Sequence, residues 1–476
     1  MINLKNINTT TVFKDIRFWI ILFFIIRLYG ITLPPLEVSH NWRQTTVTMV
    51  ARNFLEIDAN IFYPRIDIAG EKTGITGMEF PVFNYLIYLA SEIFGYQHWY
   101  GRLINLLISS LGLYFFYGLI NKYFSKSTAF YATIILSVSV WFAFSRKIMP
   151  DTFSSSLLIM SLYFGSNYLE EKNPKHLLKP LILYFFLLMF GALSKMPSAY
   201  ILIVFILFYI DKNISIKRKS IFFLVSTTAL LPTFWWYFSW VPYLVETYGF
   251  WHFFMGKSFL VGAQEIMNNF PQTLSRFYET ALKYTGFVVF LLGFYFAIKN
   301  KKKLLLYILL LSFLSFTIII IKAGFTFPHH SYYIIPFVPI MALMAGYGLA
   351  QLKNQKWALT LLLIIAAEGI LNQQHDFRIK EKEWALVDLD TQLDNYITKD
   401  DLILINSAKY PTPMYFSHRK GWVNTNEMIL QKAYIKELNS KGLQYILILK
   451  RSFGSPLKLD YKLITENDDF ALYQSR

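Results

Sequence analysis

The stretch that decides the fold class is RLINLLISSLGLYFFYGLINKYF, residues 102–124. Between its first and last basic residues it is apolar over about 20 positions, which is the length an α-helix needs to cross the hydrocarbon core of a bilayer. The basic residue near its end, Lys122, is typical of a helix that stops at the cytoplasmic surface. The segment therefore predicts a membrane-spanning helix.

Comparable runs recur from residue 16 to about residue 372 and then stop. The chain has 476 residues, of which 55% are hydrophobic and 16% charged, with a mean hydropathy of +0.38. An ordinary soluble domain carries about a quarter charged residues, so the composition indicates an integral membrane protein. We predict eleven spans, at about 16–34, 102–122, 128–146, 152–170, 177–194, 196–211, 219–240, 283–299, 303–322, 332–352 and 356–373.

The net charge of +16 is distributed in a way that excludes nucleic acid as a partner. The basic residues cluster in short tracts between apolar runs, such as NKYFSKS, DKNISIKRKS and KNKKK. With a cytoplasmic N-terminus all these tracts fall on the cytoplasmic side, as the positive-inside bias requires. The chain contains no cysteine, which rules out disulfides and thiolate metal sites.

An odd number of spans places the C-terminal region, residues 374–476, outside the cytoplasm. There the pattern changes to short strand-like runs (DLILINS, QYILILK, YKLI, FALYQ) and helical periods such as NEMILQKAYIKELNSKG, with Gly442 as its C-terminal cap. We predict an α-helical polytopic membrane protein with a transmembrane domain, 1–373, and a small extracytoplasmic α/β domain, 374–476. The expected location is the cytoplasmic (inner) membrane.

The transmembrane domain includes a large first external loop, residues 35–101, which we expect to be partly folded. Its segment VFNYLIYLASEIFG is apolar but only about fourteen residues long. That length favours a re-entrant or interfacial helix over a span.

Polar side chains gather on the external face of this topology. Burying such groups without partners costs several kcal/mol, so charges at a membrane surface often mark a site. Glu37 follows LPP, which ends the first helix just before the acid, and SHNWRQ, residues 39–44, follows Glu37. His40, Trp42, Arg43 and Gln44 together offer hydrogen-bond donors, a cation and a flat aromatic face. A solvated acid at a helix end is the alternative for Glu37.

Two further charged residues have alternatives of equal weight. Asp151, in RKIMPDTF, either faces a cavity or caps the helix that it opens. Lys195, in SKMP, either binds a ligand or extends its charge to the membrane surface. The other external candidates are Glu79, Arg146, His329, His330, Tyr332 and Tyr333. Two adjacent histidines are weak evidence for a metal, so a divalent metal stays open and no cofactor is assigned.

In this order the motifs resemble the GT-C superfamily of polytopic glycosyltransferases, in the branch of protein O-mannosyltransferases and the bacterial lipid A aminoarabinose transferase. The resemblance rests on LEVSHNWRQTTVTMVARNF, MEFPVFNYLIYLASEIFG with GRLINLL, RKIMPDTF, SKMP and HHSYYIIPFVP, and covers most of the membrane part. Bacterial members carry a similar acid, His, Trp, Arg, Gln run followed by ARNF. The family usually opens its first loop with Asp or an acidic pair, where this chain has Glu37 alone. Better-studied relatives have Lys or a similar residue near Glu79.

The resemblance implies an inverting transferase that takes a hexosyl or pentosyl group from a polyprenyl-phosphate donor to a lipid, glycan or protein acceptor outside the membrane. Glu37 would be the base for the acceptor. Arg43, Lys195 and His330 would stabilise the departing phosphate, while Asp151 and Glu79 would position the substrate or the loop. The expected partners are this donor, an unknown acceptor and the lipid bilayer.

The main alternative is a polytopic transporter or lipid flippase. Transport sites are usually built from interrupted helices in corresponding halves of the chain, and no such pair is visible in this sequence. A receptor with a sensing C-terminal domain would explain the tail but not the first loop.

Overall fold

The structure is a computed structural model that describes residues 12–249 and 256–476. Their packing forms two compact units. The first, here called the membrane unit, is built from residues up to 31, from 102 to 236 and from 256 to 374. The second, here called the loop–tail unit, is built from 32–101, from the described residues that follow 236 up to 249, and from 375–476.

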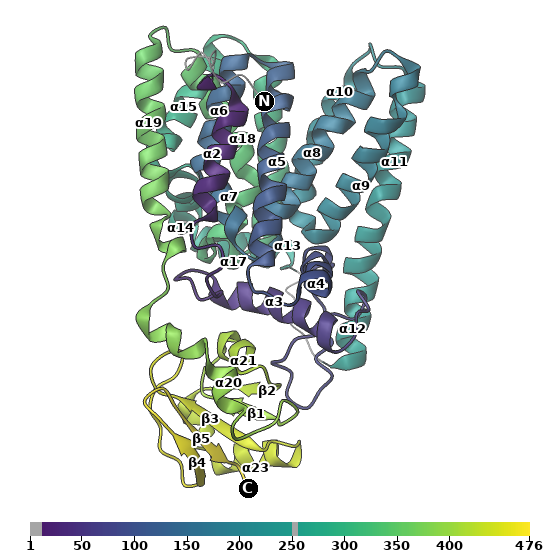
Figure 1. Cartoon of the computed structure of the whole chain (residues 1–476). Helices are drawn as coiled ribbons and strands as arrows, with labels where there is room; N and C mark the ends of the chain where they lie inside the picture. The colour runs from purple at the N-terminus through teal and green to yellow at the C-terminus, as the bar shows by residue number, and fades with distance from the viewer. Residues whose placement is uncertain (1–11, 250–255) are drawn as a thin grey trace, which may run out of the picture. The chain divides into compact units, whose positions relative to one another are not determined.

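The membrane unit consists of helices that run mostly alongside one another (Figure 1). Its α-helices are α2 (Ile16–Leu28), α5 (Tyr100–Tyr123), α6 (Lys126–Val138), α7 (Val140–Ala143), α8 (Pro150–Glu170), α9 (Leu178–Ser194), α10 (Ile206–Ile210), α11 (Ile216–Trp235), α13 (Phe259–Asn268), α14 (Phe270–Ser275), α15 (Lys283–Lys299), α16 (Lys303–Ala323), α17 (Thr326–His329), α18 (Val338–Ala350) and α19 (Gln355–Asn372). Tighter 3-10 turns cover Phe144–Arg146, Pro174–His176, Met196–Phe205, Ser331–Phe337 and Gln374–Phe377, and a π-helix covers Arg276–Ala281.

Each of the eleven predicted spans coincides with helical structure, but fewer helices are long and apolar enough to cross a membrane alone. Within the described residues there are five such helices, or seven if two bent helix pairs each count as one span. The five are Tyr100–Tyr123, Pro174–Ser194, Ile216–Tyr248, Lys303–Ala323 and Ser331–Ala350. The count of eleven therefore stays a prediction, whereas the helical membrane fold is confirmed.

Close helix packing in this unit depends on small residues. A Cβ on Gly346 of α18 would lie 2.4 Å from the backbone nitrogen of Ala132 in α6, and one on Gly293 of α15 would lie 2.0 Å from the carbonyl oxygen of Met344. Small residues at such crossings let helix backbones approach closely inside a bilayer. As a result α18 is buried along nearly its whole length.

A helix break at Ser139 was not foreseen. Helices α6 and α7 meet there at 52°, and the side-chain amide of Gln373 donates to the carbonyls of Val138 (2.7 Å) and Ser139 (3.2 Å). Arg27 of α2 in turn donates to the side-chain oxygen of Gln373. Backbone groups freed by a break must find partners inside a membrane, and this buried network supplies them.

A second bent pair, Phe270–Ala281 with Lys283–Lys299, turns through 94°. The two breaks fall in the two halves of the chain. Neither break carries a glycine or proline at the bend, which explains why no interrupted helix was visible in the sequence. The presence of the two breaks removes one argument against a transporter.

The loop–tail unit combines helices from the first loop with a small α/β domain. Its helices are α3 (Asn41–Glu56), α4 (Val82–Phe94), α12 (Val241–Tyr248), α20 (Leu389–Leu393), α21 (Thr412–Ser417), α22 (Asn426–Ile429) and α23 (Lys432–Ser440), with a 3-10 turn over Glu381–Leu386 and a π-helix over Trp236–Trp240 that leads into α12. Its strands are β1 (Ile403–Ile405), β2 (Gly421–Val423), β3 (Tyr445–Leu449), β4 (Lys462–Glu466) and β5 (Phe470–Gln474).

The strands form one mixed sheet in the order β2-β1-β3-β5-β4, parallel from β2 to β3 and antiparallel beyond (Figure 1). The predicted α/β domain is thus confirmed, including four of its strands. Strand β2 was missed because its residues, Gly-Trp-Val between Lys420 and Asn424, do not form an apolar run like that of DLILINS. Gly442, with φ 102°, follows the cap residue Lys441 and ends α23 as predicted.

Side chains alternate between the two faces of this sheet. One face, with Ile403, Ile405 and Leu447, packs into a core shared with α20, α21 and the first-loop helix α3. The other face packs on α23. The first loop and the tail therefore share one hydrophobic core, and the division of the chain at residue 373 stays a prediction.

Candidate functional site

Glu37 is fixed at the start of the loop–tail unit by contacts from both ends of the chain. It forms an isolated antiparallel bridge with Ile379, and the backbone N–H of Val38 donates to the carbonyl of Arg378 (3.2 Å). The side-chain amide of Gln44 donates to a carboxylate oxygen of Glu37 (2.9 Å). Only 1% of Glu37 is exposed, so its carboxylate has a defined orientation.

The segment SHNWRQ starts helix α3. His40 adopts a left-handed conformation (φ 66°) just before the first helical residue, Asn41. Such a conformation is uncommon for a residue other than glycine and turns the chain sharply into the helix. Gln44 is then one turn into α3, where its side chain reaches back to Glu37.

Arg43 on α3 is paired with Glu79. The guanidinium donates to a carboxylate oxygen of Glu79, and both side chains are largely buried, at 12% and 6% exposure. A buried cation needs a nearby counter-charge, so this pair explains why an acid can stand at position 79. Trp42, also on α3, is half-buried, and its carbonyl accepts from the hydroxyl of Thr46 (2.7 Å).

Asp151 lies in the first turn of α8, in the membrane unit, and is 3% exposed. The segment before it is held by Asn105 of α5, whose amide nitrogen lies within 3.2 Å of the carbonyls of Phe144, Lys147 and Met149. One carboxylate oxygen of Asp151 lies 3.4 Å from the ammonium of Lys195. Asp151 is therefore a first-turn acid, as one interpretation predicted, and also the counter-charge of a lysine.

Lys195 connects α9 to the 3-10 turn Met196–Phe205, which is the reversal expected at SKMP. Helices α8 and α9 pack tightly there, since a Cβ on Gly191 would lie 2.9 Å from Leu158. The ammonium also lies 5.8 Å from the ring centre of Tyr332, within cation–π range.

The HHSYY segment divides its two histidines. The ring of His330 lies beside those of Tyr332 (5.4 Å) and Tyr333 (6.3 Å). The ring of His329 instead stacks on Phe325, and its Nδ1 lies 2.8 Å from the Phe325 carbonyl oxygen. Asp151, Lys195, Tyr332, Tyr333 and His330 thus form one cluster, to which His329 does not belong.

Arg146 holds the end of α2, and its place in the site stays a prediction. It is buried and donates to the carbonyl of Tyr29 at the end of α2 (2.9 Å), and Arg102 donates to the carbonyl of Ile31 (3.1 Å). Cations that satisfy the last carbonyls of a helix stabilise its C-terminal end. Most of the predicted residues thus lie in two groups. The loop–tail unit holds Glu37, Arg43, Gln44 and Glu79, and the membrane unit holds Asp151, Lys195, His330, Tyr332 and Tyr333.

Several residues that build these groups were missed. In ARNF, Arg52 pairs with Asp67 (2.7 Å), and Asn53 donates to the other carboxylate oxygen (2.7 Å). Asn84, in MEFPVFN, donates to the carbonyl of Val47 (2.8 Å) and fixes α4 to α3. The quoted motifs contained these residues, but their polar partners lie 14 or more positions away, which a local pattern does not reveal.

A charged network joins the first loop to the tail near His418. Its ring nitrogens lie 2.7 Å from Glu56 and 3.2 Å from Asp390. Burial lowers the pKa of His418, but hydrogen bonds to the two carboxylates outweigh it and raise the pKa overall. Burial raises the pKa of Asp390, but hydrogen bonds from His418 and Lys399 lower it more. The pKa of Asp390 therefore lies far below its usual range.

Metal ligation was left open. Across residues 12–249 and 256–476, three or more His, Asp or Glu side chains do not come together in a way that could hold a metal ion.

Comparisons with known proteins agree on the fold. A family model described as dolichyl-phosphate-mannose-protein mannosyltransferase matches residues 78–238. No curated protein matches the sequence. Among solved structures, ArnT from Cupriavidus metallidurans bound to undecaprenyl phosphate is 11% identical with a TM-score of 0.60, and the match covers 96% of this chain and 98% of that one.

An oligosaccharyltransferase from Archaeoglobus fulgidus gives similar results. Its complex with Zn and sulfate is 13% identical with a TM-score of 0.58, covering 90% of this chain and 67% of that one. The same organism's AglB with an inhibitory peptide and dolichol-phosphate is 13% identical with a TM-score of 0.54, covering 91% and 69%. This chain is therefore a multi-pass membrane protein with the GT-C fold, and the predicted resemblance is confirmed at the level of fold.

Proposed function

We propose that this protein is an inverting glycosyltransferase that uses a polyprenyl-phosphate sugar and acts on the extracytoplasmic side of the cytoplasmic membrane. The observation that carries the proposal is the fold match over 96% of the chain to ArnT, a protein solved with undecaprenyl phosphate bound. A lipid phosphate is the class of donor that this match favours. The acceptor is a lipid, glycan or protein hydroxyl or amine.

Glu37 is the proposed base. A general base must lie within hydrogen-bond reach of the acceptor and keep one orientation while the acceptor attacks. The contacts to Gln44 and to the tail segment 378–379 provide that orientation. The acceptor attacks the anomeric carbon from the face opposite the phosphate, so that the new glycosidic bond forms as the sugar–phosphate bond breaks and the configuration inverts. Glu37 takes the acceptor proton, and the polyprenyl phosphate leaves with the electron pair.

Arg43, Lys195 and His330 are the proposed contacts for the departing phosphate. Arg43 and Lys195 each lie beside an acid, Glu79 and Asp151, which offsets the cost of a buried cation. We assign these acids to positioning, so that each cation keeps its place when the phosphate leaves. Charge stabilisation of this kind is worth roughly 3–4 kcal/mol per contact in other enzymes.

The remaining predicted residues bind the sugar or the acceptor in this proposal. Trp42 offers an aromatic face, and Tyr332 and Tyr333 offer hydroxyls. His329 is directed to Phe325 and Arg146 to the end of α2, so both receive structural roles here. The hexosyl or pentosyl identity of the transferred group depends on this lining.

The proposal is tested by donor turnover in proteoliposomes. Purified protein would be supplied with undecaprenyl-phosphate sugars (a hexose, an N-acetylhexosamine and a pentose) and, as the acceptor source, a cell-envelope extract that retains its lipids, glycans and proteins. We expect release of undecaprenyl phosphate, followed by mass spectrometry, from at least one donor, and its loss in Glu37→Gln. Release from none of the donors would contradict the transferase proposal, and equal release by Glu37→Gln would contradict the role of Glu37 as its base.

The same vesicles separate the transferase from the transporter or flippase. A fluorescent undecaprenyl-phosphate analogue confined to one leaflet should stay there in the presence of a transferase. Rapid exchange between leaflets without sugar release would favour the flippase, in which the two bent helix pairs would be the moving parts.

A further inference from the structure

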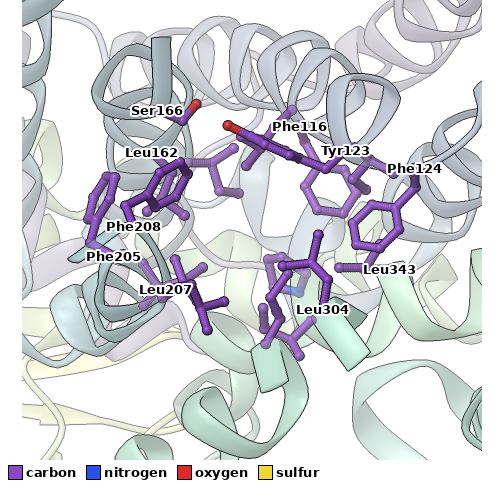
Figure 2. Close-up of a pocket in the computed structure, with 18 of the residues that line it drawn as sticks. Phe116, Tyr123, Phe124, Leu162, Ser166, Phe205, Leu207, Phe208, Leu304 and Leu343 are labelled. Carbon is purple, nitrogen blue, oxygen red and sulfur yellow. The ribbon is translucent and has the colours of Figure 1, made fainter. Parts of the chain in front are cut away.

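The membrane unit contains a cavity that the proposed reaction does not use. Its volume is about 280 Å³, close to the lower end of the range for small-molecule pockets. It lies between α5 and α8 on one side and α10, α16 and α18 on the other. Figure 2 shows that its walls are apolar side chains, among them Phe116, Leu162, Phe205, Leu207 and Leu343.

Polar groups meet at one end of this cavity. Ser166 and Tyr123 bring their hydroxyls to the same rim (Figure 2), and Glu170 and Asp211 also line the cavity. All four lie where helices α5, α8 and α10 end. The cavity therefore has apolar walls and a polar mouth. This arrangement suits an amphiphile, whose apolar chain would lie in the cavity and whose polar head would lie at the mouth.

A second, polar pocket of about 690 Å³ adjoins this mouth and shares Glu170 with it. Three lysines and a histidine line it against two glutamates: Lys122, Lys172, Lys179, His176, Glu170 and Glu171. Glu170 is already paired with Lys122 (2.6 Å). Lys172 and Lys179 then face Glu171, so this pocket keeps one net positive charge for an anionic headgroup.

The mouth lies far from the Asp151–Lys195 cluster. Asp151 and Glu170 stand near opposite ends of α8, and 19 helical residues at 1.5 Å each separate them by about 28 Å. This is about the thickness of the hydrocarbon core of a bilayer. A ligand at this mouth therefore occupies the leaflet opposite the proposed reaction.

We propose that the cavity and the adjoining basic pocket bind an anionic glycerophospholipid of the cytoplasmic leaflet. One acyl chain enters the cavity beside Leu207 and Leu343, and the phosphodiester meets Lys122 and Lys179. Basic pockets between helices at this side of a membrane recognise lipid phosphates in this way. The leaflet follows from the predicted orientation, which places the lysine-rich tracts in the cytoplasm.

The second source of a lipid phosphate is the polyprenyl carrier. A glycerophospholipid fits better because its acyl chain is short enough for much of it to enter the cavity, whereas a polyprenyl tail of many isoprene units would extend far beyond it. The site is also independent of the proposed donor chemistry, which belongs to the opposite end of α8. Its failure and the failure of the transferase proposal are therefore measured separately.

The first test maps the acyl chain on the unaltered protein. Phosphatidylglycerol with a photoactivatable diazirine at the end of one acyl chain would be added to the protein in phosphatidylcholine vesicles. We expect crosslinked peptides that contain the cavity-facing residues of 201–211 and 339–343, and their loss when unlabelled phosphatidylglycerol is in excess. Crosslinks spread over lipid-facing surfaces, or competition by undecaprenyl phosphate but not by phosphatidylglycerol, would overturn the proposal.

The second test fills the cavity and removes the charge. Leu207→Trp should cut the phosphatidylglycerol retained by the protein in native mass spectrometry, while Ile206→Trp, on the exposed neighbouring position, should not. Lys122→Ala with Lys179→Ala should lower retention of phosphatidylglycerol by roughly tenfold or more and leave that of diacylglycerol unchanged. Equal retention in the Leu207→Trp and Ile206→Trp forms, or no effect of the lysines, would refute the site.

Discussion

The ammonium of Lys195 lies 3.4 Å from a carboxylate oxygen of Asp151, and both side chains are largely buried, at 13% and 4% exposure. Lys195 follows α9 and Asp151 opens α8, so the ion pair ties two neighbouring helices together at one end. Such an ion pair can hold the two helices together, or it can present the lysine cation to a phosphate. These two roles predict different outcomes when one or both residues are replaced.

We expect Lys195→Met to lower both stability and donor turnover. Breaking a buried pair by removing one partner costs about 3–5 kcal/mol, because the other charge is left without compensation. Adding Asp151→Asn should restore much of the thermal stability without restoring turnover. The measurement is a double-mutant cycle of unfolding in detergent beside donor turnover, and recovery of both properties in the double variant would mean that Lys195 only holds the helices.

Arg43→Lys should fail to restore donor use that Arg43→Ala abolishes. A guanidinium can contact two phosphate oxygens at once and an ammonium cannot. Donor affinity and turnover would be measured for both forms. Arg65→Lys, at a loop pair with exposed Asp58 (3.0 Å), is the matched control and should behave as the native protein does.

Glu37→Gln should keep the fold and donor binding and lose most of the transfer. The amide has nearly the shape of the carboxylate and can still meet Gln44, but it cannot accept a proton from the acceptor. Glu37→Asp should fall between the two forms, since it keeps the carboxylate and withdraws it by one methylene.

Single-turnover transfer would be compared among these forms, with Glu71→Gln, an exposed acid of the same loop, as the control. Native transfer by Glu37→Gln would move the base elsewhere, and loss of donor binding would make Glu37 an anchor of the loop.

The loop–tail unit should lose stability as the pH rises above the ordinary pKa of histidine. The pKa of His418 is raised in the folded protein, so its contribution is complete below about 6.5 and disappears as the pH rises through the higher folded value. The pKa of Asp390 is lowered, so its contribution is present above its ordinary value and disappears in acid.

Both contributions are therefore present between about pH 4 and 6.5. Thermal unfolding followed from about pH 4 to above the raised pKa of His418 should show a loss of stability on the alkaline side that His418→Gln removes. His375→Gln, an exposed histidine of the same unit, should leave the profile unchanged. An identical alkaline loss in His418→Gln would show that Lys399, Arg419 and Arg52, which also face these carboxylates, set the profile instead.

The orientation of the chain can be tested by cysteine labelling, since no native cysteine interferes. Single cysteines at the exposed positions Ala59 and Lys409 should react with an impermeant reagent from outside, and those at Asn300 and Lys172 should not. The reverse pattern would invert the topology and place both proposed sites on the other faces.

Local patterns were sufficient for much of the fold. Apolar length predicted helix α5, short apolar runs predicted strands β3 and β5, and the change of composition after residue 372 predicted the α/β domain. The sequence also predicted the acids and cations of both groups, because charged residues beside apolar runs are rare and easily noticed. What failed locally was the break at Ser139, since a serine followed by valine carries no strong signal for a bend.

Contacts between distant segments were beyond such reasoning. The Arg43–Glu79 pair spans 36 positions, the Lys195–Asp151 pair 44, and the link from Glu37 to Ile379 spans 342. Each depends on which surfaces meet in three dimensions, and a single sequence gives no local trace of that choice. The pairing of Arg43 and Lys195 with acids was therefore found only in the structure.

The bridge between Glu37 and Ile379 also bears on the order of folding. The first loop shares its core with strands that lie more than 300 residues later in the chain, so its apolar surface has no permanent cover while the rest is being synthesised. Closing so long a loop is slow, because distant contacts form only after the chain entropy between them has been lost. The core that surrounds the first loop is therefore complete only after the strands of the tail have been made, and a chain that ends before them would contain every residue of the proposed site without the core that supports Glu37.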